Sequence, residues 1–197
     1  MPVRFPSPPQ EPDQAIESGL SEIRTAAQPA ADTRFAELVS FSDKRYPHEI
    51  FSARLDDLRK GQGVASAQPE GWRYLLGSAP TLTSAEVARS TDSDEYLFLG
   101  VNSGPFNESF EKALANVSGD DRVRNGDFEC RVLRVNALYL VALWLHTKAS
   151  GEDLFVPLAP TFSPFVAGRV YPVREFDELL TTAAREKPDD LKLRSTL

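Results

Sequence analysis

Residues 127–158 read DFECRVLRVNALYLVALWLHTKASGEDLFVPL, and this stretch decides the fold. Apolar and polar residues alternate through much of three segments, residues 127–135, 138–147 and 152–158, as they do in half-buried strands. Two residues separate the first segment from the second, and four separate the second from the third. Gaps of this length join antiparallel hairpins, so the stretch predicts a three-stranded meander.

The expected register follows from the two turns. If Asn136 and Ala137 form the first turn, Phe128 lies opposite Leu145, and if residues 148–151 form the second turn, Leu145 lies opposite Leu154. One face of the meander is then apolar throughout, which predicts the core face. Its residues are Phe128, Cys130, Val132, Val141, Leu143, Leu145, Leu154, Val156 and Leu158. A thiol in these surroundings is expected to be inert, with a raised pKa.

Outside the meander, the clearest elements are one more strand and two helices. Residues 96–101 form an apolar strand, and a helix after Pro105 has an apolar stripe that includes Phe110 and Val117. A second helix, about residues 173–186, places Phe176 and Leu180 inward. Residues 35–58 suit a strand followed by a helical turn, and residues 72–76 and 86–89 suit short strands. We therefore predict an α+β fold: an antiparallel sheet of about five or six strands with the two main helices packed on one face.

The chain divides by composition into three parts. Residues 1–30 combine a flexible proline-rich arm with a short helix that starts near Asp13 and carries Ile16 and Leu20 at helical spacing. Residues 31–187 have the length of a single α+β domain, and residues 188–197 form a charged tail.

Charge and cysteine content narrow the function classes. The formal net charge of -7 has the wrong sign for a protein that neutralises phosphates, so no nucleic-acid partner is expected. A single cysteine excludes an internal disulfide and favours a reducing compartment. The longest apolar run, residues 137–145, is much shorter than the roughly 20 residues of a membrane-spanning helix. The N-terminal residues also lack the apolar core of a secretory signal, so we expect a cytoplasmic protein without a membrane partner.

His146 is the strongest candidate for a catalytic residue on the second face of the meander. The expected register sets it between Asp127 and Asp153, and two carboxylates would orient the imidazole and favour its charged form. A small hydrolase or a metal-assisted acid/base enzyme could use these three residues. The simpler interpretation is a solvated polar row at the end of a sheet.

Other catalytic and cofactor signals are weak. His48 and Glu49 adjoin each other, but H-E-x-x-H is absent and a chance surface pair is the better account. Neither glycine-rich nucleotide-binding motif occurs, so no cofactor and no metal site is expected.

The second face also carries the candidate binding residues. Trp144 and Phe155 lie there beside Glu129 and Arg131, and aromatic residues with a charged rim are typical of protein interfaces. If a helix covers this face, the aromatics are core instead. The sequence therefore favours a non-catalytic protein-binding module, adaptor or inhibitor-like, that binds another protein.

Overall fold

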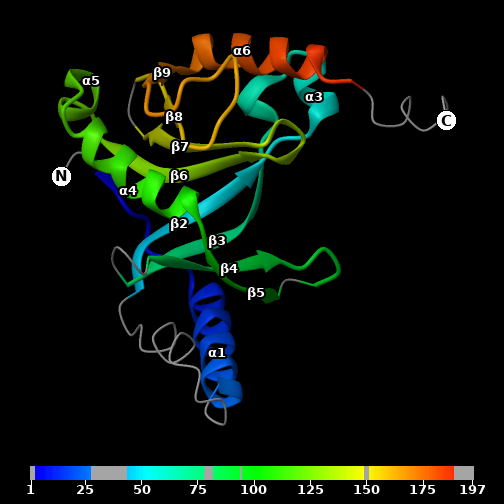
Figure 1. Cartoon of the computed structure of the whole chain (residues 1–197), viewed down its shortest axis with the longest axis vertical. Helices are drawn as coiled ribbons and strands as arrows, with labels where there is room; N and C mark the ends of the chain where they lie inside the picture. Colours follow the sequence, from blue (N-terminus) through cyan, green and yellow to red (C-terminus); the bar gives the residue numbers. More distant parts are fainter. Residues whose placement is uncertain (1–2, 28–43, 78–81, 94, 149–150, 189–197) are drawn as a thin grey trace, which may run out of the picture.

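The computed structural model describes residues 3–27, 44–77, 82–93, 95–148 and 151–188 (Figure 1). The strands are β1 (Val3–Arg4), β2 (Lys44–Ser52), β3 (Gln68–Leu76), β4 (Thr83–Arg89), β5 (Tyr96–Ser103), β6 (Phe128–Val135), β7 (Leu140–Thr147), β8 (Leu154–Pro157) and β9 (Tyr171–Pro172). The α-helices are α1 (Gln10–Ala27), α3 (Leu55–Arg59), α4 (Pro105–Val117), α5 (Asp121–Arg124) and α6 (Val173–Glu186). The fold is α+β, as predicted.

One sheet of nine strands runs through the molecule in the order β5-β4-β3-β2-β6-β7-β8-β9, with β1 beside β6. Most neighbours are antiparallel, but β2 and β1 pair with β6 in parallel. The prediction of five or six strands was too low. Residues 44–103 supply four full strands, of which the sequence shows only the last, residues 96–101, clearly; the other three appear there as short or ambiguous segments.

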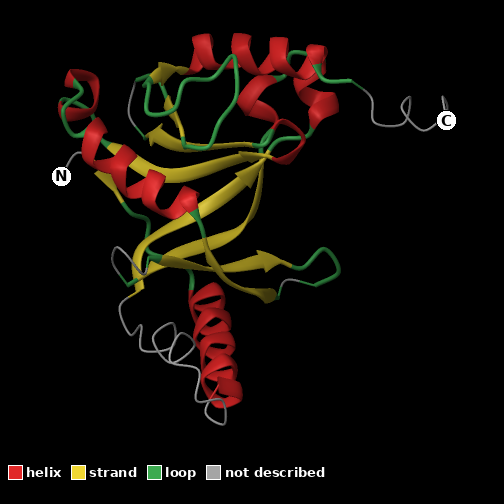
Figure 2. Ribbon diagram, in the orientation of Figure 1, coloured by secondary structure: helices red, strands yellow, loops and turns green. Residues whose placement is uncertain are grey.

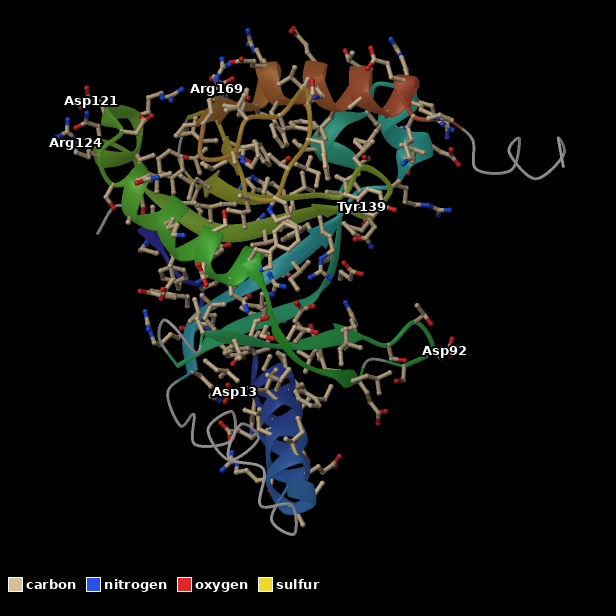
Figure 3. All side chains as sticks on the ribbon, in the orientation of Figure 1. Asp13, Asp92, Asp121, Arg124, Tyr139 and Arg169 are labelled. Carbon is tan, nitrogen blue, oxygen red and sulfur yellow. The ribbon has the colours of Figure 1, made fainter. Side chains whose placement is uncertain are left out.

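The meander of β6, β7 and β8 is confirmed, and one of its two registers is as predicted. Leu145 lies opposite Leu154, but Phe128 lies opposite Thr147 rather than Leu145. The first connection is longer than two residues, because a short 3-10 turn precedes Tyr139, which lies at the tip with a left-handed φ of 51° (Figure 3). A shift of two residues leaves every side chain on its expected face. All nine residues of the predicted core face lie in one buried cluster.

The two main helices lie on opposite faces of the sheet, not on one (Figures 1 and 2). On the face that we call the α4 face, Phe110 and Val117 of α4 pack against the predicted core residues. On the other face, the α6 face, Phe176 and Leu180 of α6 pack against Phe155 and its neighbours. Both faces of β6–β8 carry apolar residues, so each requires a cover.

Helix α1 covers a third apolar cluster, at the β3–β5 end of the sheet. Ile16 and Leu20 pack there against Trp72 of β3 and Val87 of β4. The pairing of Trp72 with Glu49, and of Glu49 with Arg131, places this cluster on the same side as α6. The α6 face is therefore covered at both ends by different helices.

The first described residues, from Val3 on, belong to the fold, so the predicted flexible arm is not what the structure shows. Val3 is buried in the core under α4, and the Phe5 ring lies 4.9 Å from that of Tyr46. Helix α1 begins at Gln10 and includes Pro12, which a first turn tolerates because its N–H groups have no intrahelical partner. Residues 1–2, 28–43 and 189–197, which include most of the predicted tail, lie outside the described residues.

None of the helices in the described part of the chain is long and apolar enough to cross a membrane.

Candidate functional site

The α6 face is polar in its middle, between the part covered by α6 and the part covered by α1. We call this region the polar strip. Alternate residues of neighbouring strands point to one side of a sheet, and here that side carries charged and aromatic groups. The strip consists of Glu49 and Phe51 of β2, Glu129 and Arg131 of β6, Trp144 and His146 of β7, together with Lys148 and Asp153.

Arg131 is held in place at the centre of the polar strip. Its guanidinium carbon lies 5.0 Å from the ring centre of Phe51 and 5.3 Å from that of Trp144. Its Nη2 donates to Glu129 Oε1 at 3.0 Å. The Arg131 side chain keeps 19% of its surface exposed, so a positioned cation remains within reach of solvent or a partner.

The two glutamates of the strip, Glu49 and Glu129, differ in their electrostatic surroundings. Burial opposes ionisation of Glu129, but hydrogen bonds from Lys148 and Arg131 outweigh it and hold the Glu129 pKa below its ordinary value. For Glu49, burial raises the pKa, Arg131 opposes the rise and Glu129 adds to it. Among the described residues, no cation forms an ion pair with Glu49. In the described part of the chain, Glu49 is thus a half-buried carboxylate that forms no ion pair, and only the nearby charge of Arg131 favours its ionised form.

The structure brings His146 and Asp153 together as predicted, but not Asp127. His146 Nδ1 lies 3.0 Å from Asp153 Oδ2, and the same carboxylate accepts from the Trp144 indole N–H at 2.7 Å. Asp127 instead pairs with Arg4 at 2.6 Å, because the two-residue shift of β6 places Glu129 opposite His146. The predicted trio is therefore reduced to a pair.

A histidine oriented by a carboxylate can act as a general base if a substrate reaches its other nitrogen. His146 is 30% exposed, and Asp153 borders an open depression of about 650 Å³ lined also by Glu152 and Arg174. Cys130 is no nucleophile for it, because burial raises the thiol pKa and the side chain lies on the α4 face. Within the described residues, no group of three or more His, Cys, Asp and Glu could hold a metal ion.

Two of the four predicted binding residues lie in the core and two lie at the edge of the exposed surface. Phe155 is fully buried, with its ring 4.5 Å from that of Phe176 in α6, and Trp144 is nearly so. The sequence left open whether a helix covers these aromatics, and α6 does. Glu129 and Arg131 stay at the border of the covered region, where they contact solvent.

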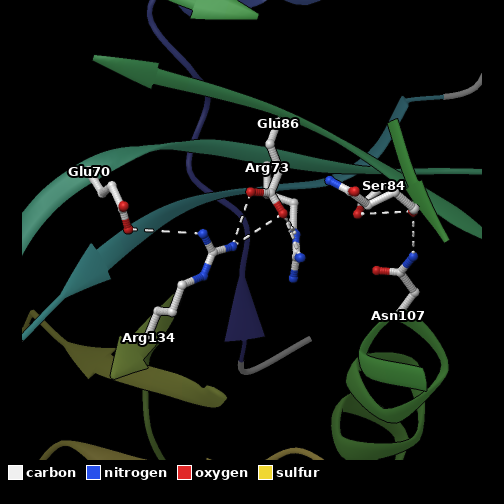
Figure 4. A network of polar contacts seen from close by, with 7 residues as sticks. Glu70, Arg73, Ser84, Glu86, Asn107 and Arg134 are labelled. Carbon is white, nitrogen blue, oxygen red and sulfur yellow. Dashed lines mark hydrogen bonds and ion pairs between the residues drawn. The ribbon is translucent and has the colours of Figure 1, made fainter. Parts of the chain in front are cut away.

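Sequence reasoning missed a buried charged network on the α4 face (Figure 4). Glu86 of β4 accepts hydrogen bonds from Arg73 at 2.7 Å and from Arg134 at 3.0 Å, and Arg134 also approaches Glu70 at 4.0 Å. Burial opposes ionisation of Glu86, but Arg73 and Arg134 outweigh it and hold its pKa below the ordinary value. Only the β3–β4 and β2–β6 pairings, which the sequence does not reveal, bring these residues together.

His48 lies near this network and is fully buried, so its expected place at the surface was wrong. Burial first, and then the Arg73 cation, lower the His48 pKa to about 3. The ring is therefore neutral at pH 7. It stacks on Phe110 at 4.7 Å, and Nδ1 lies 2.7 Å from the Tyr46 carbonyl oxygen, to which it donates if it carries the proton. These contacts make His48 part of the packing between β2 and α4.

Comparison of the chain with protein-family models, with curated proteins and with solved structures finds no match.

Proposed function

We propose that this protein is a non-catalytic protein-binding module whose partner docks on the polar strip. Arginine and aromatic residues are enriched at protein interfaces, and the strip presents the positioned Arg131 beside the partly buried ring of Phe51. Its carboxylates add charged groups around them. The net charge of -7 favours a protein partner over a nucleic acid, and the single cysteine favours the cytoplasm.

The observation that carries this proposal is the state of Glu49. A carboxylate that is half-buried without an ion pair is destabilised in its charged form, as the raised pKa of Glu49 expresses. A lysine or arginine from a partner would relieve that cost, and burial of the new pair would strengthen it. We therefore expect the partner to present a basic side chain to Glu49.

The test compares Glu49→Gln with Glu22→Gln, a matched change at an exposed position of α1. The tagged protein is cross-linked in cells of its native host, companions are identified by mass spectrometry, and the affinity of the purified companion is then measured. We expect Glu49→Gln to weaken binding about tenfold or more without lowering the thermal midpoint, and Glu22→Gln to leave binding unchanged. Equal affinity for wild type and Glu49→Gln would exclude this site.

A second candidate function is acid/base catalysis by His146, favoured by its hydrogen bond to Asp153 beside the open depression. Under this alternative, His146→Ala abolishes hydrolysis of a panel of esters and amides with little change in the thermal midpoint. Asp127→Ala is the control, because Asp127 pairs with Arg4 and not with His146. A substitution at His146 that changes only stability would reject catalysis.

A further inference from the structure

Strand β5 ends the sheet at the side opposite to β9, and its edge lacks the charges and prolines that protect many edge strands. Among the described residues, β4 pairs with one side of β5 and no strand pairs with the other. Its eight residues, YLFLGVNS, include no charge and no proline. At the opposite end, β9 has two residues, one of them a proline, and leads directly into α6. Natural proteins protect edges by such short, proline-containing or charged strands.

Two leucines of β5 are turned to solvent. Leu97 is 54% exposed and Leu99 is 59% exposed, whereas Phe98 between them packs with the cluster under α1. Leu99 is the extra residue of a bulge, since Glu86 pairs with Gly100 and Val87 with Phe98. Gly100 has a φ of 124°, which a side chain rarely adopts. A bulge of this kind re-aims a side chain, and here it leaves a large apolar one exposed.

Helix α1 lies beside the β5 edge, so a strand added there would contact α1 as well as β5. It packs so closely on the strand that a Cβ at Gly19 would lie 2.2 Å from the Phe98 ring. Beyond this contact, α1 continues past the edge of the sheet (Figure 1). Ile23, on the turn after Gly19, is partly buried. A strand added to β5 would therefore find backbone groups on one side and the α1 surface on the other.

We infer that the β5 edge binds an extended segment of another protein by strand addition, at a surface separate from the polar strip. Exposed backbone N–H and C=O groups of an edge select a partner in strand conformation, and the two leucines select apolar side chains at alternate positions. Asp92 (Figure 3) and Glu95 lie exposed in the β4–β5 turn, so the segment carries a lysine or arginine at the end nearest Tyr96.

A separate segment fits this edge better than a second copy of the chain. An antiparallel pairing of two β5 strands centred on Phe98 would set Leu97 against Leu99 of the second copy. Because α1 crosses β5 at Phe98 and continues past the edge, that pairing would also bring both α1 helices to the same place.

The test selects a displayed library of random twelve-residue peptides against the whole protein and measures the affinity of the synthesised winners. Leu97→Lys with Leu99→Lys removes the two leucines. Phe162→Lys with Val166→Lys, at two similarly exposed positions between β8 and β9, is the matched control. We expect winners with alternating apolar residues and a basic end, a loss of about tenfold or more in the β5 variant, and none in the control. Those amides of residues 96–101 that point away from β4 should also become protected from hydrogen exchange when the peptide binds.

Three results would overturn the inference. One is selection without enrichment, and another is binding that the β5 variant retains. The third is a dimer of the protein alone, detected by sedimentation and abolished by the β5 substitutions, which would assign the edge to a second copy. Unchanged thermal midpoints of both variants ensure that a loss of binding is not a loss of folding.

Discussion

Glu86 compensates two arginines inside the protein, Arg73 almost completely buried and Arg134 nearer the surface. Taking a cation out of water is unfavourable unless a carboxylate accompanies it, so the three residues depend on one another. Charge is thus part of the packing on the α4 face, beside an otherwise apolar core.

Replacing Glu86 tests this dependence. We expect Glu86→Ala to lower the free energy of unfolding by about 3 to 5 kcal/mol, because Arg73 would remain buried without a counter-charge. Urea denaturation measures the loss. Glu70→Ala is the control, since Glu70 meets Arg134 only at 4.0 Å and is partly exposed, and should cost less than about 1 kcal/mol. Equal losses in the two variants would contradict this account.

The lowered pKa of His48 predicts that the free energy of unfolding falls between pH 7 and pH 5, above the range in which most carboxylates titrate. Its folded-state pKa is about 3 and its ordinary value is 6.5, so between these values the unfolded chain binds a proton that the folded protein does not. Stability from this source is present above pH 6.5 and is lost as the pH falls toward 3. From pH 7 to pH 5 the loss is about 2 kcal/mol.

The measurement is urea denaturation of wild type and His48→Gln at pH 7, 6 and 5. Glutamine retains an N–H donor for the Tyr46 carbonyl but has no proton to gain in this range. His48→Gln should therefore lose about 2 kcal/mol less than wild type over the interval. Parallel slopes for the two proteins would show that His48 is not the titrating group.

Among the elements, α1 shows how closely a helix can approach this sheet. Alanine is about 1 kcal/mol more favourable than glycine inside a helix, so Gly19→Ala should stabilise an isolated α1. In the protein, the new methyl group would overlap the Phe98 ring, and overpacking costs about 1 to 3 kcal/mol. The two effects together give an expected net loss of up to about 2 kcal/mol in thermal or urea unfolding. Ser18→Ala, on the exposed side of α1, is the control and should raise the stability. A gain in stability for Gly19→Ala as well would refute the close contact with Phe98.

The sequence predicted elements best where side-chain alternation was strong. In β6–β8, parity alone assigned each residue to its face, although the register of β6 on β7 was displaced by two residues. The displacement arose from Tyr139, whose left-handed backbone no residue-type signal announced. It also explains the candidate site: Asp153 pairs with His146 as predicted, whereas Glu129 occupies the place expected for Asp127.

At the scale of the whole molecule, the arrangement of layers could not be predicted from the sequence. An amphipathic helix shows that it needs a partner but not which side of a sheet supplies it. The sequence alone therefore could not assign α4 or α6 to a particular face. The structure places α4 on the predicted core face and α6 on the opposite face. The same limit hid the buried network, because Arg134 reaches Arg73 and Glu86 only through the pairing of β2 with β6, two strands that are distant in sequence.

The pairing of β1 with β6 has a consequence for biosynthesis. Val3 lies opposite Phe128 in the sheet, and β2 also pairs with β6. Neither β1 nor β2 can form this pairing until β6, which is translated much later, has been synthesised. While the ribosome is still translating the intervening 75 or more residues between β2 and β6, β2 can pair only with β3. Contacts this far apart close slowly, so we expect the partly folded nascent chain to expose apolar surface until β6 emerges.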